Sequence, residues 1–192
     1  MLKPSCTGAF SKLKVLVVGD LILDRYVWGK VDRISPEAPV VVVGVTSESM
    51  CLGGAGNVAY NITKLGATAE VVGVIGEDNH AHDFLSVLQK SIGSQDGVVQ
   101  TPEKPTIVKT RIIAHSQQVV RVDREKAGAF SQSVEDDLIE SLTAKLVGVD
   151  AVIMSDYAKG VICPRIVNLV SAKCSELNIP LIIDPKNANF GI

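Results

Sequence analysis

The sequence predicts an α/β domain built on a mainly parallel central sheet. Continuous apolar runs at residues 14–19 and 69–76 both end in glycine, which is typical of strands buried on both faces of a parallel sheet. Similar runs follow at residues 151–154 and 179–184. Segments with apolar residues at helical spacing lie between these runs. Strands that alternate with helices in this way indicate βαβ units.

Length and composition limit the fold and the function. A chain of 192 residues with 46% hydrophobic residues is long enough to bury the core of one domain. A net charge of −2 offers no positive surface for nucleic acid, and no apolar run approaches the roughly 20 residues of a membrane span. The N-terminal residues 1–11 lack the long apolar core of a secretion signal. We therefore expect a cytoplasmic protein with no nucleic-acid or membrane partner.

The cysteines and histidines do not form a metal-binding pattern. No Cys-x-x-Cys pair is present and no histidine lies close to a cysteine in the sequence, which argues against a zinc site and a disulfide framework. His80 and His82 begin a predicted helix without a third ligand at metal-binding spacing, so no metal site is assigned. Reduced thiols are expected at Cys6, Cys51, Cys163 and Cys174.

Charged side chains follow the predicted strands at their carboxyl ends, where ligands of parallel sheets gather. Asp20 and Asp24 come just after the first run, and either carboxylate could accept a bond from a substrate hydroxyl. The alternative for each is a turn or a surface ion pair. Later runs lead to Asp156, Lys159 and Lys186, which are predicted at the same edge of the sheet.

Two segments depart from the alternation of strands and helices and are predicted to form hairpins. Runs rich in β-branched and aromatic residues at 26–29 and 40–43 flank a proline-containing turn, so the span 25–49 is expected to leave the core as an antiparallel pair. Residues 106–115 and 118–124 alternate like half-exposed strands, with a turn between them.

A glycine-rich segment opens the helix expected between the hairpin and the second strand run. Gly53, Gly54 and Gly56 have no side chains, so backbone amides can approach a ligand, and the first helical turn presents unpaired N–H groups to a hydroxyl or an anion. The spacing fits neither the dinucleotide fingerprint nor the P-loop. The alternative is a glycine turn followed by Asn57 as the helix N-cap.

The same helix is expected to bury one stripe of larger side chains. Val58, Ile62 and Leu65 recur at spacings of four and three residues, which places them on one helical face. Gly66 is placed to end the helix.

The second hairpin carries a row of cations. Lys109 and Arg111 share one face of its first strand, and Arg121 and Asp123 share one face of its second strand. Guanidinium groups bind phosphate through paired hydrogen bonds, so the row could hold the phosphate of a sugar phosphate. The alternative is a solvated strand face, and Arg33 carries the same two interpretations.

The glycine segment resembles the first signature of the ribokinase-like, or PfkB-type, sugar kinases. Within that family the resemblance is greatest to the heptose 7-phosphate kinase domains of ADP-heptose synthesis. The motifs that carry it span nearly the whole chain, at residues 19–26, 33–40, 53–59, 117–123, 155–160 and 184–186.

The resemblance implies a ribokinase-like three-layer fold with a mainly parallel central sheet and a small β-lid, with lid strands at about 25–49 and 105–125. Gly53, Gly54 and Asn57 would line the sugar pocket, and Asp24, five residues beyond Gly19, would hold sugar hydroxyls. Some members of the family form dimers through the lid, so a homodimer is expected.

The implied reaction is ATP-dependent phosphorylation of D-glycero-β-D-manno-heptose 7-phosphate at its anomeric hydroxyl, with ATP and Mg as co-substrate and metal of the intact enzyme. The product is the 1,7-bisphosphate of the route to ADP-heptose and the lipopolysaccharide core. A nucleotidyltransferase is often fused to this kinase. Lys186 is expected near the ATP phosphates, and four residues are expected near the substrate: Lys109, Arg111, Arg121 and Asp156.

One family motif is missing from the sequence. Ribokinase-like kinases carry a second signature, Asp-Thr-x-Gly-Ala-Gly-Asp, whose last Asp is the catalytic base, and no such run occurs here. A complete kinase has roughly 300 residues. We therefore expect residues 1–192 to be the N-terminal part of one kinase domain, truncated at its C-terminal side and inactive alone. The alternatives are a non-catalytic sugar-phosphate-binding or regulatory module, and a piece that serves only in assembly.

Overall fold

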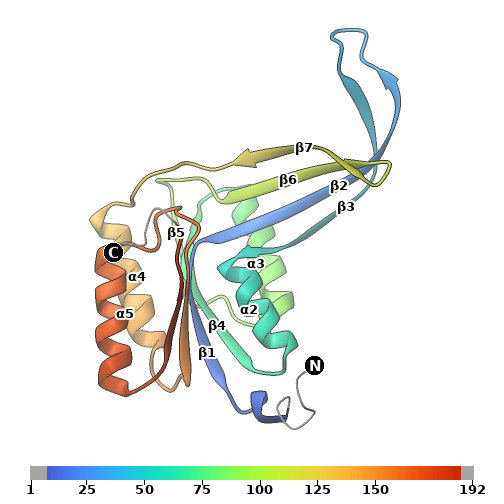
Figure 1. Cartoon of the computed structure of the whole chain (residues 1–192). Helices are drawn as coiled ribbons and strands as arrows, with labels where there is room; N and C mark the ends of the chain where they lie inside the picture. The colour runs from blue at the N-terminus through green and yellow to red at the C-terminus, as the bar shows by residue number, and fades with distance from the viewer. Residues whose placement is uncertain (1–7, 187–192) are drawn as a thin grey trace.

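The central sheet of the molecule has five parallel strands in the order β5-β4-β1-β8-β9 (Figure 1). The structure is a computed structural model that describes residues 8–186. The parallel sheet predicted from the four apolar runs is confirmed, and it has a fifth strand, β5, that was not predicted. Its strands are β1 (Lys14–Gly19), β4 (Thr68–Gly76), β5 (Val98–Thr101), β8 (Ala151–Ser155) and β9 (Leu181–Asp184).

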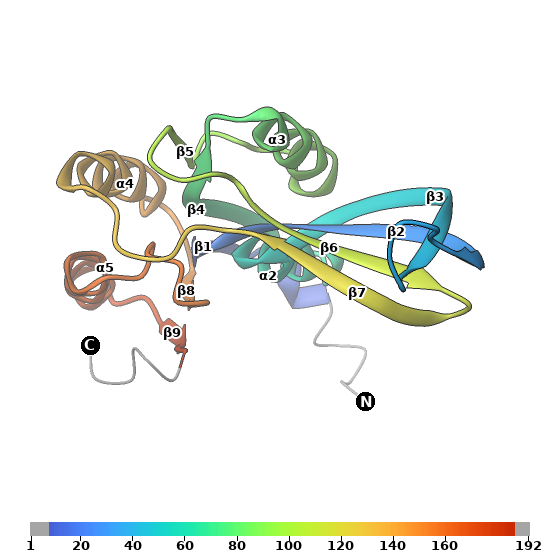
Figure 2. The same ribbon diagram turned by 90° about the horizontal axis from the view of Figure 1, so that it is seen from above.

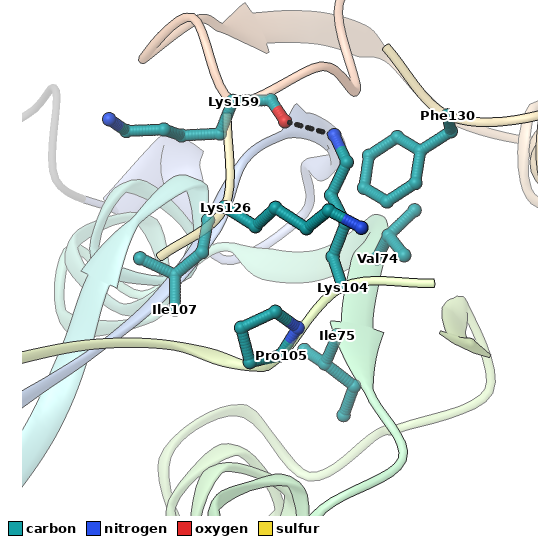
Figure 3. A pocket seen from close by; sticks show the side chains of 8 residues that line it. All are labelled: Val74, Ile75, Lys104, Pro105, Ile107, Lys126, Phe130 and Lys159. Atoms are coloured by element: carbon teal, nitrogen blue, oxygen red, sulfur yellow. Dashed lines mark hydrogen bonds between the residues drawn. The ribbon is translucent and has the colours of Figure 1, made fainter. Parts of the chain in front are cut away.

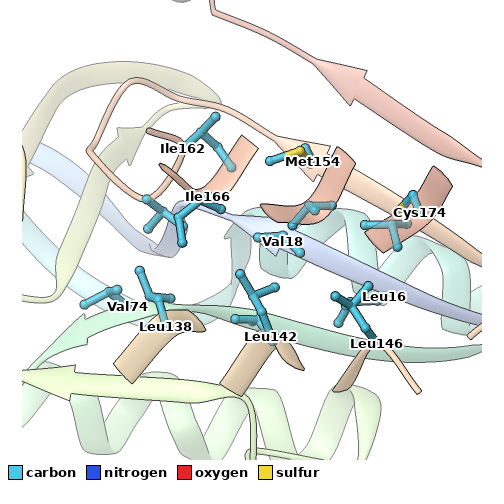
Figure 4. Close-up of a cluster of buried hydrophobic side chains, with 14 of the residues drawn as sticks. Leu16, Val18, Val74, Leu138, Leu142, Leu146, Met154, Ile162, Ile166 and Cys174 are labelled. Atoms are coloured by element: carbon cyan, nitrogen blue, oxygen red, sulfur yellow. The ribbon is translucent and has the colours of Figure 1, made fainter. Parts of the chain in front are cut away.

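Two pairs of helices cover the two faces of this sheet (Figures 1 and 2). Successive side chains of β1 point to opposite faces, so Val17 packs on one pair, whereas Leu16 and Val18 pack on the other (Figure 4). One face carries α2 (Ala55–Lys64) and α3 (Asn79–Ile92), and the opposite face carries α4 (Gln132–Lys145) and α5 (Pro164–Leu177).

A second sheet, in the order β3-β2-β6-β7, extends from the central sheet over α2 and α3 (Figure 1). Both predicted hairpins are present as antiparallel pairs, and β2 and β6 join them in parallel. The strands are β2 (Leu21–Ile34), β3 (Val41–Gly54), β6 (Ile107–Ala114) and β7 (Gln117–Arg124).

The first hairpin is longer than the sequence predicted. Its ladder continues to the pairing of Leu21 with Gly54, beyond the predicted limits of 25 and 49. The physical reason is burial, because Leu21, Leu23 and Leu52 at the base of the hairpin pack against α2 and α3. The hairpin therefore begins inside the core and leaves it only further along.

The predicted interpretation of α2 needs two corrections. Gly54 is the N-cap, so Asn57 lies inside the first turn and is not the cap. Small residues, Ala55, Gly56 and Ala59, form the fully buried face, which lets the helix lie close to the sheet.

The larger side chains of α2 are consequently displaced from the buried face. Val58 and Ile62 are only partly buried, and Leu65 is 50% exposed, so the predicted buried stripe is wrong at its C-terminal end. Gly66 follows the helix with a φ of 98°, a left-handed conformation that suits glycine, as predicted.

The strand order locates the switch point of the central sheet. From β1 the chain goes first to β4 and β5 on one side, and later to β8 and β9 on the other. In open α/β sheets, ligands bind beyond the carboxyl ends of the strands at such a point. The carboxyl ends of β1 and β8 are therefore the place to look for a site.

Candidate functional site

Asp20 fills the switch point itself. It directly follows β1, is fully buried, and accepts backbone N–H bonds from Tyr157 at 2.8 Å, Lys159 at 3.0 Å and Val161 at 3.2 Å. Burial raises the pKa of Asp20, although these three hydrogen bonds act in the opposite direction. Asp20 therefore holds the loop after β8 in place, and its carboxylate is not exposed to a substrate hydroxyl.

Asp156 has similar contacts in the same loop. It is 5% exposed, and its two carboxylate oxygens accept bonds from the backbone N–H groups of Ala158 at 2.7 Å and Lys186 at 3.0 Å. Ala158 has a φ of 56°, an uncommon value for a residue with a side chain. These contacts give Asp156 a structural role, while the exposed side chain of Lys186 begins just past β9. Contact of either residue with a ligand stays a prediction.

Lys104 is a buried residue that the sequence analysis did not identify. Its ammonium group donates to the carbonyl oxygens of Gly128 and Lys159, the latter at 3.2 Å, and lies 3.8 Å from the centre of the Phe130 ring (Figure 3). Burial lowers the pKa of Lys104, and the charge of Asp20 opposes that shift. A lysine in a short polar connection carries no sequence signal for such burial, because only the tertiary fold brings these carbonyl groups together.

Asp24 lies on the second sheet, four residues into β2, and not at the end of β1. Its neighbours in register are Cys51 on β3 and Lys109 on β6. The guanidinium group of Arg111 bonds to Asp24 Oδ1, and this bond raises the pKa of Arg111. Both side chains are largely shielded from water, with 17% of Asp24 and 23% of Arg111 exposed.

The two glycines of the signature fit closely against the two aspartates. A Cβ on Gly53 would lie 2.6 Å from Asp24 Oδ2, and a Cβ on Gly54 would lie 2.2 Å from the carbonyl oxygen of Asp20. Gly54 also has a φ of 55°, which favours glycine. Asn57 is exposed on the first turn of α2, three residues after Gly54. The segment thus joins the Asp24 carboxylate to a helix start, as a small-molecule platform requires.

The predicted cations share one face of the second sheet with Asp24. We call this surface the charged face; it consists of Asp24, Lys109, Arg111, Arg121 and Asp123. Lys109 contacts Asp123 at 3.2 Å and Arg121 contacts the same carboxylate at 2.8 Å, so Arg121 and Lys109 lower the pKa of Asp123.

Carboxylate groups thus pair with most of the cations that the sequence predicted on the charged face. Glu125, which the sequence analysis did not identify, contacts Lys159 at 2.8 Å and Lys109 at 3.5 Å, and so links the charged face to the loop after β8. Arg33 lies near the far end of β2, opposite Val42, and is not brought to Asp24.

Other predicted features have simpler surroundings. Among residues 8–186, no group of three His, Cys, Asp or Glu side chains is arranged to hold a metal ion. Cys51, Cys163 and Cys174 are free thiols, and Cys6 lies outside the described residues. His80 approaches Asp83 at 3.9 Å. No helix in the described part of the chain is long and apolar enough to cross a membrane.

Comparison with known proteins gives matches over most of the chain. The model of the pfkB family of carbohydrate kinases matches residues 12–190. A relative from Trichlorobacter lovleyi called "Bifunctional protein HldE" is 46% identical over 180 residues, which are 94% of this chain and 37% of the relative. The chain thus spans little more than a third of that protein.

Solved structures show the same fold. A ribokinase from Giardia lamblia matches with a TM-score of 0.64 and 20% identity, over 93% of this chain and 56% of that one. An Arabidopsis thaliana ribokinase complexed with ribose and ATP matches with a TM-score of 0.56 and 18% identity, over 90% and 53% of the two chains. With the family model covering nearly all of its residues, the chain belongs to the pfkB family of carbohydrate kinases.

Proposed function

We propose that this chain supplies the sugar-binding part of a kinase that phosphorylates D-glycero-β-D-manno-heptose 7-phosphate at its anomeric hydroxyl, forming the 1,7-bisphosphate on the route to ADP-heptose and the lipopolysaccharide core. The observation that carries the proposal is the charged face. It combines a shielded carboxylate, Asp24, with three cations next to the Gly53 segment. The family and the name of the Trichlorobacter relative support a heptose-phosphate kinase.

In the proposed reaction each group binds one part of the substrate. Asp24 accepts hydrogen bonds from sugar hydroxyls, and the Asn57 amide can donate to them or accept from them. The backbone at Gly53 and Gly54 lets the sugar approach the start of α2. The 7-phosphate binds to the row of cations: Lys109, Arg111 and Arg121. Phosphoryl transfer depends mainly on such positioning and on charge stabilisation.

The nucleotide side is only partly represented in the described residues. Lys186 is exposed just beyond β9, where it would approach the phosphates of ATP. The catalytic base is proposed to lie outside the 192 residues, because the second signature of the family does not occur in the sequence. The 192-residue chain alone is therefore expected not to transfer a phosphoryl group. Formation of the bisphosphate by this chain would contradict that expectation.

The proposal is tested by titration calorimetry of the chain with D-glycero-D-manno-heptose 7-phosphate. We expect binding near one site per chain that is lost in Asp24→Ala and in Asn57→Ala. Arg33→Ala is the matched control, because Arg33 is a cation of the same sheet that lies far from Asp24. Absence of binding by the folded chain, or equal loss in the control, would contradict the proposal.

We further propose that two copies of the intact cytoplasmic protein pair through the second sheet, and that a nucleotidyltransferase is fused to the kinase. The outer strands β3 and β7 carry exposed apolar side chains on the face opposite the charged face, which a partner would cover: Met50, Val120 and Val122. Light scattering is expected to give a dimer that Val122→Asp converts to a monomer. An unchanged mass in that variant would refute pairing through this surface.

A further inference from the structure

We infer that Arg111 determines specificity by closing the sugar-hydroxyl site until a phosphorylated sugar arrives. Its guanidinium group is bonded to Asp24, the carboxylate that is proposed to bind the sugar. A phosphate on the substrate offers the guanidinium another anion and so releases Asp24 for the hydroxyls. This inference rests on the proposed function and adds the condition that both ends of the substrate are needed together.

The register of the second sheet shows that Arg111 reaches Asp24 diagonally. Its partner across the β2–β6 ladder is Tyr26, whereas the partner of Asp24 is Lys109. The side chain of Arg111 therefore runs back along the sheet by two residues to reach Asp24 Oδ1. A different rotamer would carry the guanidinium group away from the carboxylate without any movement of the backbone.

Tyr26 offers the guanidinium group a second contact. The centre of the guanidinium lies 5.4 Å from the centroid of the Tyr26 ring, within the range of a cation–π interaction. Tyr26 in turn stacks on Trp28, with ring centroids 6.3 Å apart and planes at 19°. The aromatic pair can keep Arg111 on the charged face after its bond with Asp24 is broken.

The two oxygens of Asp24 face different surroundings. Arg111 holds Oδ1, while Oδ2 lies against Gly53, where a Cβ would come within 2.6 Å. A hydroxyl alone is a poor competitor for Asp24, because it would leave the largely shielded guanidinium group without a counter-charge. A sugar phosphate supplies both the hydroxyl and a replacement anion for the guanidinium.

Arg111 differs in this respect from the other cations of the charged face. Lys109 and Arg121 are held by Asp123, which is not assigned to the sugar. Loss of either cation would weaken phosphate binding but would leave Asp24 occupied by Arg111. Only removal of Arg111 should open the hydroxyl site to an unphosphorylated sugar.

The test compares two ligands by titration calorimetry, heptose 7-phosphate and the same heptose without phosphate. Arg111→Met is expected to weaken binding of the phosphorylated sugar at least tenfold and to strengthen binding of the plain sugar several-fold. Arg121→Met should weaken the first without strengthening the second. Arg25→Met is the matched control, because Arg25 bonds to Glu48 on the opposite face of the sheet, and it should change neither affinity.

The outcomes separate the inference from the proposed function. Equal weakening of both sugars by Arg111→Met, or no change in either, would overturn the inference while wild-type binding still supports the function. If the wild type binds neither the phosphorylated nor the plain sugar, both the inference and the proposed function are overturned. The gain for the plain sugar should vanish when Asp24→Asn is added to Arg111→Met. Circular dichroism checks that each variant is folded, and Arg111→Gln replaces Arg111→Met if that variant is not.

Discussion

Substitution of Gly54 by alanine is expected to destabilise the fold strongly, because two separate features of the structure require a glycine there. The backbone of Gly54 has φ 55° and ψ −137°, a combination that costs a residue with a side chain about 1–3 kcal/mol. The new Cβ would also lie 2.2 Å from the carbonyl oxygen of Asp20. Relief of that overlap by a backbone shift costs about 1–3 kcal/mol more.

Gly66→Ala is the matched control for this prediction. Gly66 also has a positive φ, 98°, but a Cβ there would meet nothing within 4 Å. Its expected cost is therefore the conformational term alone, about 1 kcal/mol. Gly54→Ala is expected to cost about 4 kcal/mol as the midpoint of its two contributions.

Urea unfolding followed by circular dichroism measures the difference. With a slope of about 2 kcal/mol per molar urea, Gly54→Ala should lower the midpoint by about 2 M and Gly66→Ala by about 0.5 M. Equal shifts of the two variants would refute the reasoning, because they would show that the contact with Asp20 does not limit the residue at position 54.

Three further predictions concern the core, a buried charge and acid stability. Leu142→Ala, at a fully buried position of α4, should lower the free energy of unfolding in urea by about 2–5 kcal/mol. Leu65→Ala, at a half-exposed position, should lower it by less than about 1 kcal/mol. Similar losses in the two variants would contradict the observed burial. Lys104→Met should lower the free energy of unfolding by about 2–4 kcal/mol, because two carbonyl groups lose an ammonium donor. Lys126→Met removes a hydrogen bond at the surface and should change that free energy by no more than about 0.5 kcal/mol. A thermal-shift assay that finds equal effects of the two variants would refute the role of the buried charge. Burial would raise the pKa of Glu70, but its bonds with two lysines outweigh burial and leave that pKa below the usual value. The stabilisation of the fold by ionised Glu70 is therefore complete above the unfolded-state pKa of about 4.3 and is lost as the pH falls through the lower folded-state pKa. Glu70→Gln should flatten the acid limb of a plot of melting temperature against pH. An unchanged acid limb would exclude this contribution.

The sequence predicted the secondary structure well wherever a pattern was long and local. Four of the five parallel strands, the helices of the central layers and both hairpins follow from apolar periodicity, because a strand or helix must bury one set of side chains whatever its neighbours are. The fifth strand, β5, has only four residues and was not predicted. The prediction failed in α2, where the buried stripe depends on how closely the helix can approach the sheet. Small side chains on α2 set the distance between the helix and the sheet, so the spacing of the large apolar side chains predicted the wrong buried face.

The candidate site was predicted in its residue types but not in its contacts. Asp24, Gly53 and the cations of the second hairpin were identified from spacing and resemblance, and the structure brings them to one face. The sequence could not separate Asp20 from Asp24, because both are acidic residues that follow the same strand. Only the loop after β8, which donates its backbone N–H groups to Asp20, shows that this carboxylate is structural.

The sequence by itself determined the fold class, the family and the set of charged residues that are proposed to bind the sugar, since these depend on local patterns and on motifs that stand unbroken in the chain. The tertiary structure alone decided which charges meet. Arg111 and Asp24 are 87 residues apart in the chain, yet they form one ion pair because β2 and β6 are neighbours in the second sheet. Pairing between distant strands is set by the packing of the whole molecule, and no local pattern in either strand encodes it.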